Sequence, residues 1–333
     1  MIVVAGAGGF IGGHLVKYLR ECYCGLIRAV DKKPLSQWYQ VGAETPSVSA
    51  SLSPRVQSLC LDLSDPKSCQ RACEGATEVY QLAADMGGIG FIEHYRVACM
   101  RSVLINVHML EAACRAGVQR YFYSSSACVY NTQLQQDPNV RALKESDAYP
   151  AMAERGYGWE KLYSEMLCQE YWAERELETH IARFHNCYGP HGAWNDGREK
   201  APAAICRKVI EAVRSNGAVT IWGDGSKTRS FMYIDDCVRG IEKIMHEDRF
   251  IAKPVNLGST EMVTINELVT LAEEFAGVQL ERKYDMSAPQ GVGGRNSDNT
   301  LIRDTLGWEP SIPLKNGLGA TYDWICERMG GSA

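Results

Sequence analysis

The chain is predicted to fold as an α/β protein with a doubly wound parallel sheet and a smaller C-terminal α/β domain. Two observations predict this class. Short apolar runs alternate with helical segments through the first 185 residues, and the first run leads directly into a glycine-rich turn. After about residue 185 the alternation loosens into long loops, proline-bearing segments and shorter helices. We therefore predict a first domain over residues 1–185 and a substrate domain over residues 186–333.

The first strand and the turn after it indicate a phosphate-binding loop. Residues 2–5 are apolar and rich in β-branched side chains, which is typical of a buried strand, and residues 13–20 are predicted to be helical. Between them the glycines have the spacing G-x-x-G-x-x-G. Gly6 allows a tight turn, Gly9 lets a pyrophosphate approach the backbone, and Gly12 permits close packing of helix on strand. An ordinary glycine-rich loop is the alternative, and the flanking strand and helix favour dinucleotide binding.

The second predicted strand, residues 26–30, ends at an acidic side chain. Asp31 lies 19 residues after Gly12, where a carboxylate is expected to accept hydrogen bonds from the ribose hydroxyls of an adenine dinucleotide. A carboxylate there favours NAD over NADP because it would repel a 2′-phosphate. Lys32 and Lys33 follow directly and weaken that preference.

Asp62 follows the third predicted strand, residues 56–61, and has two interpretations. It is placed to reach the adenine at the end of that strand, or it is a helix N-cap or turn aspartate. Further strands are predicted at residues 78–83, 119–124 and 179–184. Ligands of such sheets bind outside the carboxyl ends of the strands. Four candidate segments follow such ends: residues 6–12, 83–85, 124–128 and 183–190.

A tyrosine and a lysine four residues apart suggest a catalytic base. Tyr157 and Lys161 would lie one turn apart on one helix face, so the ammonium group is predicted to lower the pKa of the phenol. A phenolate near neutral pH suits alcohol oxidation. Ser126 and Cys128 add a hydroxyl and an ionisable thiol at a strand end. The alternatives are a solvated tyrosine beside a surface lysine and a packed, inert cysteine.

Bulk properties indicate a cytoplasmic enzyme. The chain has 333 residues, 45% hydrophobic, which is enough for a sizeable core. A net charge of −5 argues against a nucleic-acid partner, and no stretch is expected to span a membrane. The 13 cysteines show neither a disulfide framework nor a zinc spacing, so most are predicted to be small buried hydrophobes and no metal is expected. Residues 42–54 are rich in serine and proline and are predicted to form a surface loop.

Several of these segments together resemble the extended short-chain dehydrogenase/reductases that act on nucleotide sugars. The resemblance covers about residues 2–326 and implies a Rossmann domain over residues 1–185, with residues 235–257 returning to it. It also implies a bound NAD and a homodimer formed through helices near residues 93–116 and 157–175, paired as a four-helix bundle. The matching segments are residues 6–12, 82–84, 124–127, 157–161, 186–190, 229–236 and 255–258.

Other segments resemble one branch of that family, the enzymes that epimerise GDP-mannose at carbons 3 and 5. These segments are residues 84–92, 125–130, 143–148, 197–204 and 293–299. The resemblance implies cofactor contacts from Gly6, Gly9, Phe10, Ile11, Gly12, Asp31, Asp62, Leu82, Ala83, Ala84, Tyr157 and Lys161. It implies substrate contacts from Gly88, Ser126, Asn186, Lys200, Lys208 and Arg295, and catalytic roles for Ser126, Cys128, Tyr157, Lys161 and Lys200.

The implied chemistry is a transient oxidation followed by proton exchange. Tyr157 would take the proton of the hexose 4-hydroxyl while hydride passes to NAD, and the resulting ketone acidifies the hydrogens on carbons 3 and 5. Cys128 would be the base and Lys200 the acid on the opposite face, each favouring the other's charged form. Arg295 would contact the diphosphate, and Gly88 would leave room for the sugar or the nicotinamide. The alternatives are a UDP-sugar 4-epimerase, a 4,6-dehydratase, or a non-catalytic NAD-binding protein.

Overall fold

The structure of the chain is a computed structural model that describes residues 1–42 and 56–331. The predicted surface loop at residues 42–54 lies outside these residues, apart from Gly42. Before it, α2 (Tyr39–Gly42) follows a short 3-10 turn, η1 (Leu35–Gln37). Trp38 between them is buried in the main core, where its indole packs against the backbone of Gly8.

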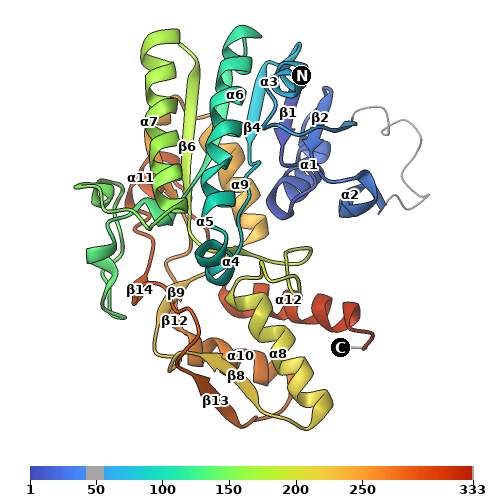
Figure 1. The fold of residues 1–333 in the computed structure, drawn as a ribbon, viewed down its shortest axis with the longest axis vertical. Coiled ribbons are helices and arrows are strands. Elements are labelled where there is room, and N and C mark those ends of the chain that lie inside the picture. Colours follow the sequence, from blue (N-terminus) through green and yellow to red (C-terminus); the bar gives the residue numbers. More distant parts are fainter. Residues whose placement is uncertain (43–55, 332–333) are drawn as a thin grey trace.

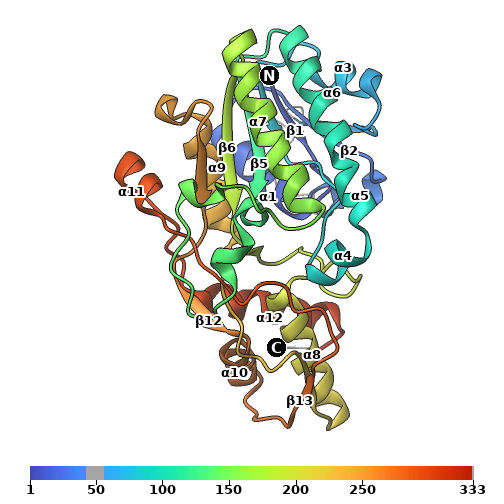
Figure 2. The same ribbon diagram turned by 60° about the vertical axis from the view of Figure 1, so that its left-hand side comes forward.

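Seven parallel strands form the main sheet, in the order β11-β6-β5-β4-β1-β2-β3 (Figures 1 and 2). The predicted doubly wound fold is therefore confirmed, and the six predicted strands differ from the observed ones by at most two residues at each end. Chain order reverses on either side of β1, so the crevice between its carboxyl end and that of β4 is where a ligand is expected. The strands are β1 (Ile2–Ala5), β2 (Ile27–Asp31), β3 (Val56–Cys60), β4 (Glu78–Gln81), β5 (Arg120–Ser126), β6 (Glu178–Phe184) and β11 (Pro254–Leu257).

Helices cover both faces of this sheet. Continuous apolar strands such as Ile2–Ala5 are buried on both sides, which is why each face carries its own core cluster. Residues 234–257 contribute to one of these clusters and to the edge strand β11, and the predicted domain boundary at residue 185 stays a prediction. One face packs α1 (Phe10–Cys22) and α9 (Ile234–Met245); the other packs α3 (Pro66–Cys73), α6 (Ser102–Arg115) and α7 (Tyr157–Arg175).

The C-terminal half builds a second layer below the sheet in Figure 1. In the described residues, its core lies between three helices and three small sheets. The short helix α4 (Ile89–His94) lies where the two parts meet. The helices are α8 (Ala201–Ser215), α10 (Ile265–Ala276) and α12 (Leu314–Arg328), and α11 (Thr300–Leu306) packs on β11. The strand groups are β8 (Val219–Trp222) with β13 (Arg282–Asp285); β9 (Thr228–Ser230) with β12 (Met262–Thr264) and β14 (Gly294–Arg295); and β7 (Cys187–Tyr188) with β10 (Met232–Tyr233).

One helical run corrects the expectation that no stretch has the length of a membrane span. The 20-residue stretch 96–115 joins α5 (Arg96–Met100) to α6 through Arg101. It reaches a mean hydropathy of 1.3, so it is long and apolar enough to cross a membrane by length and composition alone. Helices in the core of a protein can be equally long and apolar. Here Met109 and Leu110 pack in the core beside the sheet, and Asn106 donates hydrogen bonds inside a buried polar network. This packing is what a helix covering a sheet requires.

Candidate active site

The glycine turn between β1 and α1 has the geometry of a phosphate cradle. Gly6 has a φ of +82°, and a Cβ there would lie 2.8 Å from the backbone of residues 82 and 83. A Cβ on Gly12 would lie 2.2 Å from the Gly6 carbonyl oxygen, so only glycine lets α1 pack this close to the turn. Gly9 caps α1 without a side-chain hydrogen bond, which leaves the first helical N–H groups available to an anion. Phe10 and Ile11, predicted cofactor contacts, form the first turn of α1.

Asp31 braces this cradle at the end of β2. Its carboxylate accepts hydrogen bonds from the backbone N–H groups of Gly8, at 3.0 Å, and of Lys33, at 2.9 Å. The two neighbouring lysines are engaged elsewhere: Lys33 donates to the Gly8 carbonyl at 3.2 Å, and Lys32 pairs with Asp85 at 3.6 Å. Neither ammonium group is left without a partner to attract a 2′-phosphate, which fits NAD better than NADP.

The other predicted cofactor residues lie at the same edge of the sheet. Leu82, Ala83 and Ala84 follow β4, and the Leu82 amide donates to the Ala5 carbonyl at 3.1 Å. Asp62 accepts a hydrogen bond from the Ser64 amide at 2.9 Å, which lowers the pKa of its carboxyl group. Of its two interpretations, the turn aspartate is the one with an observed contact.

Four predicted catalytic side chains meet where β5 ends and α7 begins. Ser126 is the last residue of β5 and accepts a hydrogen bond from the Cys128 amide at 3.2 Å. Tyr157 is the first residue of α7, and Lys161 lies one turn further on. The start of α7 packs closely against the Cys128 carbonyl. A Cβ on Gly158 would lie 2.3 Å from that oxygen, so only glycine fits there. Thiol and phenol also share an apolar cluster with α4 and α5.

The predicted lowering of the Tyr157 pKa is wrong for this structure. Burial raises the pKa of the phenol well above its usual value near 10, and the neighbouring Cys128 and Glu160 raise it further. A hydrogen bond with the Ser126 hydroxyl lowers it, but by less. Lys161 is itself buried, which lowers its pKa, and its ammonium donates to the Ser124 carbonyl at 2.9 Å. Sequence spacing indicates that two side chains are neighbours, but it carries no measure of how deeply they are buried.

Cys128 and Lys200 are brought together, and burial dominates both. Burial raises the pKa of the Cys128 thiol, and nearby Glu154 raises it further, while Arg295, Ser126 and Lys200 oppose them. Burial lowers the pKa of Lys200, and Cys187 and Cys128 oppose that shift. The predicted mutual effect of thiol and ammonium is present, but burial is the larger influence and shifts both pKa values in the opposite direction.

Gly88 positions Lys200 instead of leaving open space for a sugar. The Gly88 amide donates to the Arg198 carbonyl at 2.8 Å, and a Cβ on Gly88 would lie 2.2 Å from the Glu199 carbonyl oxygen. The room predicted at this glycine is therefore filled by the segment that carries Lys200. Lys200 itself is the N-cap residue of α8.

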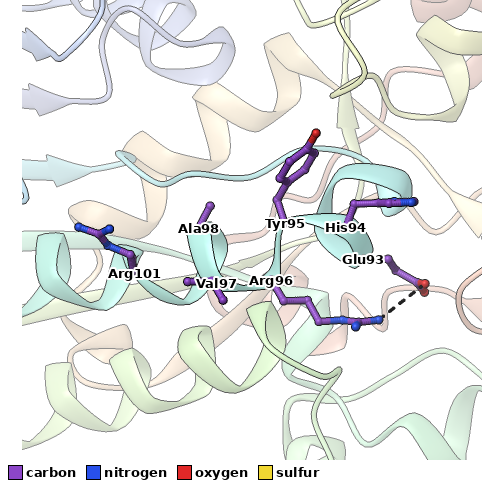
Figure 3. A pocket seen from close by; sticks show the side chains of 7 residues that line it. All are labelled: Glu93, His94, Tyr95, Arg96, Val97, Ala98 and Arg101. Carbon is purple, nitrogen blue, oxygen red and sulfur yellow. Dashed lines mark ion pairs between the residues drawn. The ribbon is translucent and has the colours of Figure 1, made fainter.

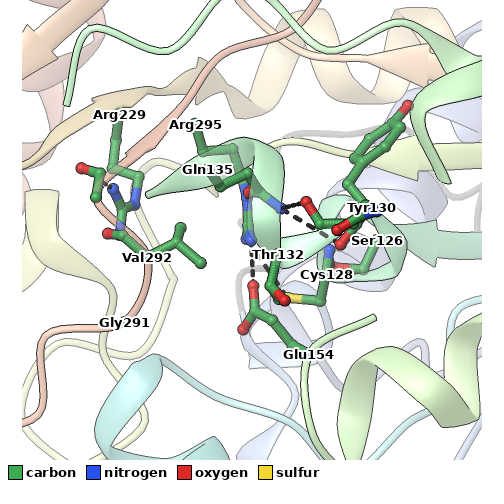
Figure 4. A network of polar contacts seen from close by, with 12 residues as sticks. Ser126, Cys128, Tyr130, Thr132, Gln135, Glu154, Arg229, Gly291, Val292 and Arg295 are labelled. Atoms are coloured by element: carbon green, nitrogen blue, oxygen red, sulfur yellow. Dashed lines mark hydrogen bonds and ion pairs between the residues drawn. The ribbon is translucent and has the colours of Figure 1, made fainter. Parts of the chain in front are cut away.

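Arg295 contacts protein groups where a diphosphate contact was predicted (Figure 4). Its side chain is 7% exposed, and its Nε donates to Gln135 Oε1 at 2.7 Å. One terminal nitrogen contacts the Cys128 sulfur at 3.6 Å, and the other forms an ion pair with Glu154. A buried guanidinium needs such partners because its desolvation is costly. Gln135 and Glu154 are the residues that sequence reasoning missed, because neither lies in a segment that carries the resemblance.

Asn186 and Lys208 each contact other groups of the protein. Asn186 donates through its side-chain amide to the Ser230 carbonyl at 3.0 Å, which engages the group predicted to bind substrate. Lys208 donates to the Thr220 carbonyl at 2.9 Å, and its ammonium lies 5.3 Å from the ring centre of Trp222. Trp222 is 44% exposed and lies over Gly90. Among residues 1–42 and 56–331, no group of three or more His, Cys, Asp or Glu side chains is arranged to hold a metal ion.

Comparison with known proteins places this site in a family. Residues 2–258 match the model of the NAD dependent epimerase/dehydratase family. The chain belongs to this family. Its cofactor is therefore NAD, as predicted, and the cradle of Gly6, Gly9 and Gly12 fits the pyrophosphate of that cofactor.

Curated relatives and solved structures extend the comparison. The chain is 43% identical to GDP-mannose 3,5-epimerase 1 of Oryza sativa subsp. japonica and 41% identical to GDP-mannose 3,5-epimerase of Arabidopsis thaliana, each over 98% of this chain and 82% of the relative. The fold is similar to that of UDP-glucose 4-epimerase from Thermotoga maritima, with a TM-score of 0.83 and 24% identity over 98% of this chain and 99% of that one. UDP-glucuronic acid 4-epimerase from Bacillus cereus, solved with UDP-glucuronic acid and NAD, has a TM-score of 0.82 at 24% identity, covering 98% of this chain and 99% of that one.

Proposed function

We propose that this protein epimerises GDP-mannose at carbons 3 and 5, towards GDP-L-galactose and GDP-L-gulose, through a transient ketone at carbon 4. The observation that supports this most is the pair of Cys128 and Lys200 beside Ser126 and Tyr157. A 4-epimerase needs no acid–base pair beyond the tyrosine, so this pair would have no task in it. The full-length similarity to two plant GDP-mannose 3,5-epimerases supports the same substrate.

The residues divide the chemistry between them. Bound NAD supplies the acceptor for the hydride that leaves carbon 4, and later returns it. Tyr157, in its phenolate form, takes the proton of the 4-hydroxyl as that hydride leaves, and the Ser126 hydroxyl donates to the developing 4-oxygen. The ketone then acidifies the C–H bonds at carbons 3 and 5. The Cys128 thiolate removes such a hydrogen as a proton, and the Lys200 ammonium gives a proton to the opposite face of the same carbon.

Burial does not prevent this pair from reaching its charged form. Transfer of the thiol proton from Cys128 to the Lys200 amine creates a thiolate and an ammonium with no change in net charge. The cost of two buried ions is offset by their attraction when they face each other. Tyr157 and Lys161 serve the oxidation and reduction at carbon 4. The Cys128 thiol and the Lys200 amine serve the inversion of configuration at carbons 3 and 5.

Exchange with solvent tests this function. Purified protein is incubated with GDP-mannose in deuterated water, and deuterium at carbons 3 and 5 is followed by NMR. We expect incorporation that is lost in Cys128→Ala and in Lys200→Met. Conversion of a UDP-sugar without any exchange at carbons 3 and 5 of GDP-mannose would instead support a 4-epimerase and would sink this proposal.

We also propose a homodimer in the cytoplasm, formed through α5, α6 and α7. Large apolar side chains are exposed along these helices, including Val97 at 74%, Tyr163 at 49% and Met166 at 48%. The surface hollow beside α5, about 420 Å³, is lined by residues 93–98 and Arg101 (Figure 3). Burying this face against a second copy would form the four-helix bundle predicted from the sequence.

A further inference from the structure

Arg295 connects the predicted base to a carboxylate that nothing in the sequence marks as functional. Its guanidinium lies between three acceptors: the Gln135 amide oxygen, the Cys128 sulfur and the Glu154 carboxylate. In Figure 4 these side chains point toward one another from four separate segments of the chain. The side chain of Arg295 is 7% exposed and that of Glu154 is 16% exposed, so their ion pair is shielded from solvent.

Glu154 reaches Cys128 in a second way, through the backbone. The Glu154 amide donates to the Cys128 carbonyl at 3.0 Å, three residues before Tyr157. The same residue therefore fixes the main chain of Cys128 and, through Arg295, contacts its sulfur. A side chain that merely balanced a buried charge would not need this position beside the thiol.

The charges around the sulfur make this carboxylate important. Arg229 is a second, partly buried guanidinium near Arg295, and its pKa is lowered to about 10 by desolvation and by Arg295, with Glu154 and Cys128 opposing. The cations thus outnumber the anions, and a thiolate at Cys128 is an anion that would compete with Glu154 for the same guanidinium groups. The titratable or charged groups that face Cys128 are Cys99, Glu154, Tyr157, Lys161, Lys200, Arg229 and Arg295.

We propose that Glu154 is a positioning residue for Cys128: its carboxylate holds the Arg295 guanidinium on the sulfur and, by its own charge, opposes formation of the thiolate. This proposal rests on the proposed function for the role of Cys128 as a base. Glu154 does not touch the reacting carbon. It acts through Arg295, and it determines the pH at which the thiol becomes a base.

Two substitutions separate charge from geometry. Glu154→Gln keeps an oxygen that can accept from Arg295 but removes the negative charge. Glu154→Asp keeps the charge on a side chain shorter by one methylene. We expect the thiolate to form at lower pH in Glu154→Gln, and at higher pH in Glu154→Asp, whose shorter carboxylate keeps its charge but holds Arg295 on the sulfur less well. The midpoint is the pH at which half of the Cys128 side chains are thiolate. Arg295→Gln should raise this midpoint, because it removes the cation that favours the thiolate.

The midpoint is measured on the thiol itself, without substrate. Cys128 is alkylated with iodoacetamide across pH 6–10, and the rate is followed by peptide mass spectrometry, with the exposed Cys60 as the internal control in each sample. Below the wild-type midpoint we expect about tenfold faster alkylation of Cys128 in Glu154→Gln, which is a shift of about one pH unit. Cys60 should react equally in every variant.

The outcomes are decisive in each direction. Midpoints of Glu154→Gln and Arg295→Gln that both coincide with wild type would overturn the proposal. If Glu154→Gln does not fold, an unmoved midpoint in Arg295→Gln overturns it alone, and a raised one supports it. Solvent exchange at carbons 3 and 5 is then measured on the same variants. A shifted alkylation midpoint with no exchange in any protein, wild type included, refutes the proposed function and leaves the action of Glu154 on the thiol standing.

Discussion

The glycine turn predicts that Gly12→Ala disrupts both folding and cofactor binding. The added Cβ would lie 2.2 Å from the Gly6 carbonyl oxygen, 2.7 Å from its carbon and 3.0 Å from the Ala7 Cα, all of them backbone atoms. Ordinary contact begins near 3.4 Å, so α1 must move by about 1 Å away from the turn. Overpacking of this kind costs about 1–3 kcal/mol of unfolding free energy. The displaced helix N-terminus should also bind NAD at least about tenfold more weakly, since small misplacements are costly in preorganised sites.

Gly9→Ala is the matched variant in the same turn. Its Cβ would meet only the Gly6 carbonyl oxygen, at 3.1 Å, so the fold has room for it while the path of the pyrophosphate does not. We expect an unfolding free energy within about 0.5 kcal/mol of wild type in urea, measured without NAD, but weaker NAD binding by calorimetry. Wild-type stability together with wild-type NAD affinity in Gly12→Ala would refute the assigned role of this turn.

Three further predictions concern stability and assembly. Arg183→Met should lower the unfolding free energy by about 3–5 kcal/mol in urea denaturation, because it strands the buried Glu165 carboxylate that Arg183 contacts at 2.7 Å; a loss below 1 kcal/mol would contradict this. Met166→Glu should yield monomers in light scattering after size exclusion, whereas Val213→Glu on α8, which is 39% exposed in wild type, should leave the dimer intact. His246 has its pKa raised to about 9 by a hydrogen bond with Glu78, so its stabilising contribution is complete below about pH 6.5 and is lost as pH rises through about 9. The melting temperature of His246→Asn should therefore fall less than that of wild type between pH 6.5 and 9.5.

The sequence predicts those parts of the site that local patterns specify. The strand, turn and helix of residues 2–22 lie where the periodicity and glycine spacing indicate, because a buried parallel strand and a glycine turn each have a strong local signature. Ser126 ends β5, Cys128 follows directly after it, and Tyr157 is the first residue of α7, the helix that leads from β5 to β6. Parallel topology places strand ends and the starts of the following helices at one edge, so their convergence follows from the fold class.

The parts that could not be predicted depend on contacts between distant segments. Arg295 lies 167 residues from Cys128 and 141 from Glu154, and no spacing rule connects positions so far apart. Its guanidinium is equally suited to a diphosphate and to a buried carboxylate, so residue type alone could not decide between them. Burial is the second missing quantity. It reverses the expected direction of the Tyr157 shift, because desolvation of a phenol outweighs a lysine that faces a backbone carbonyl.

Burial also explains why charged side chains that do not touch the substrate surround Cys128. Burial raises the pKa of Cys128 and lowers that of Lys200, so a working thiolate–ammonium pair must be stabilised by the groups around it. Arg295 supports the thiolate and Glu154 opposes it, and both are held in place by the same ion pair. When groups interact this strongly, the pH at which the base forms belongs to the cluster and not to the cysteine. A change at Glu154, which is 16% exposed and lies outside every recognised motif, should then alter the pH profile as much as a change at a residue that touches the sugar.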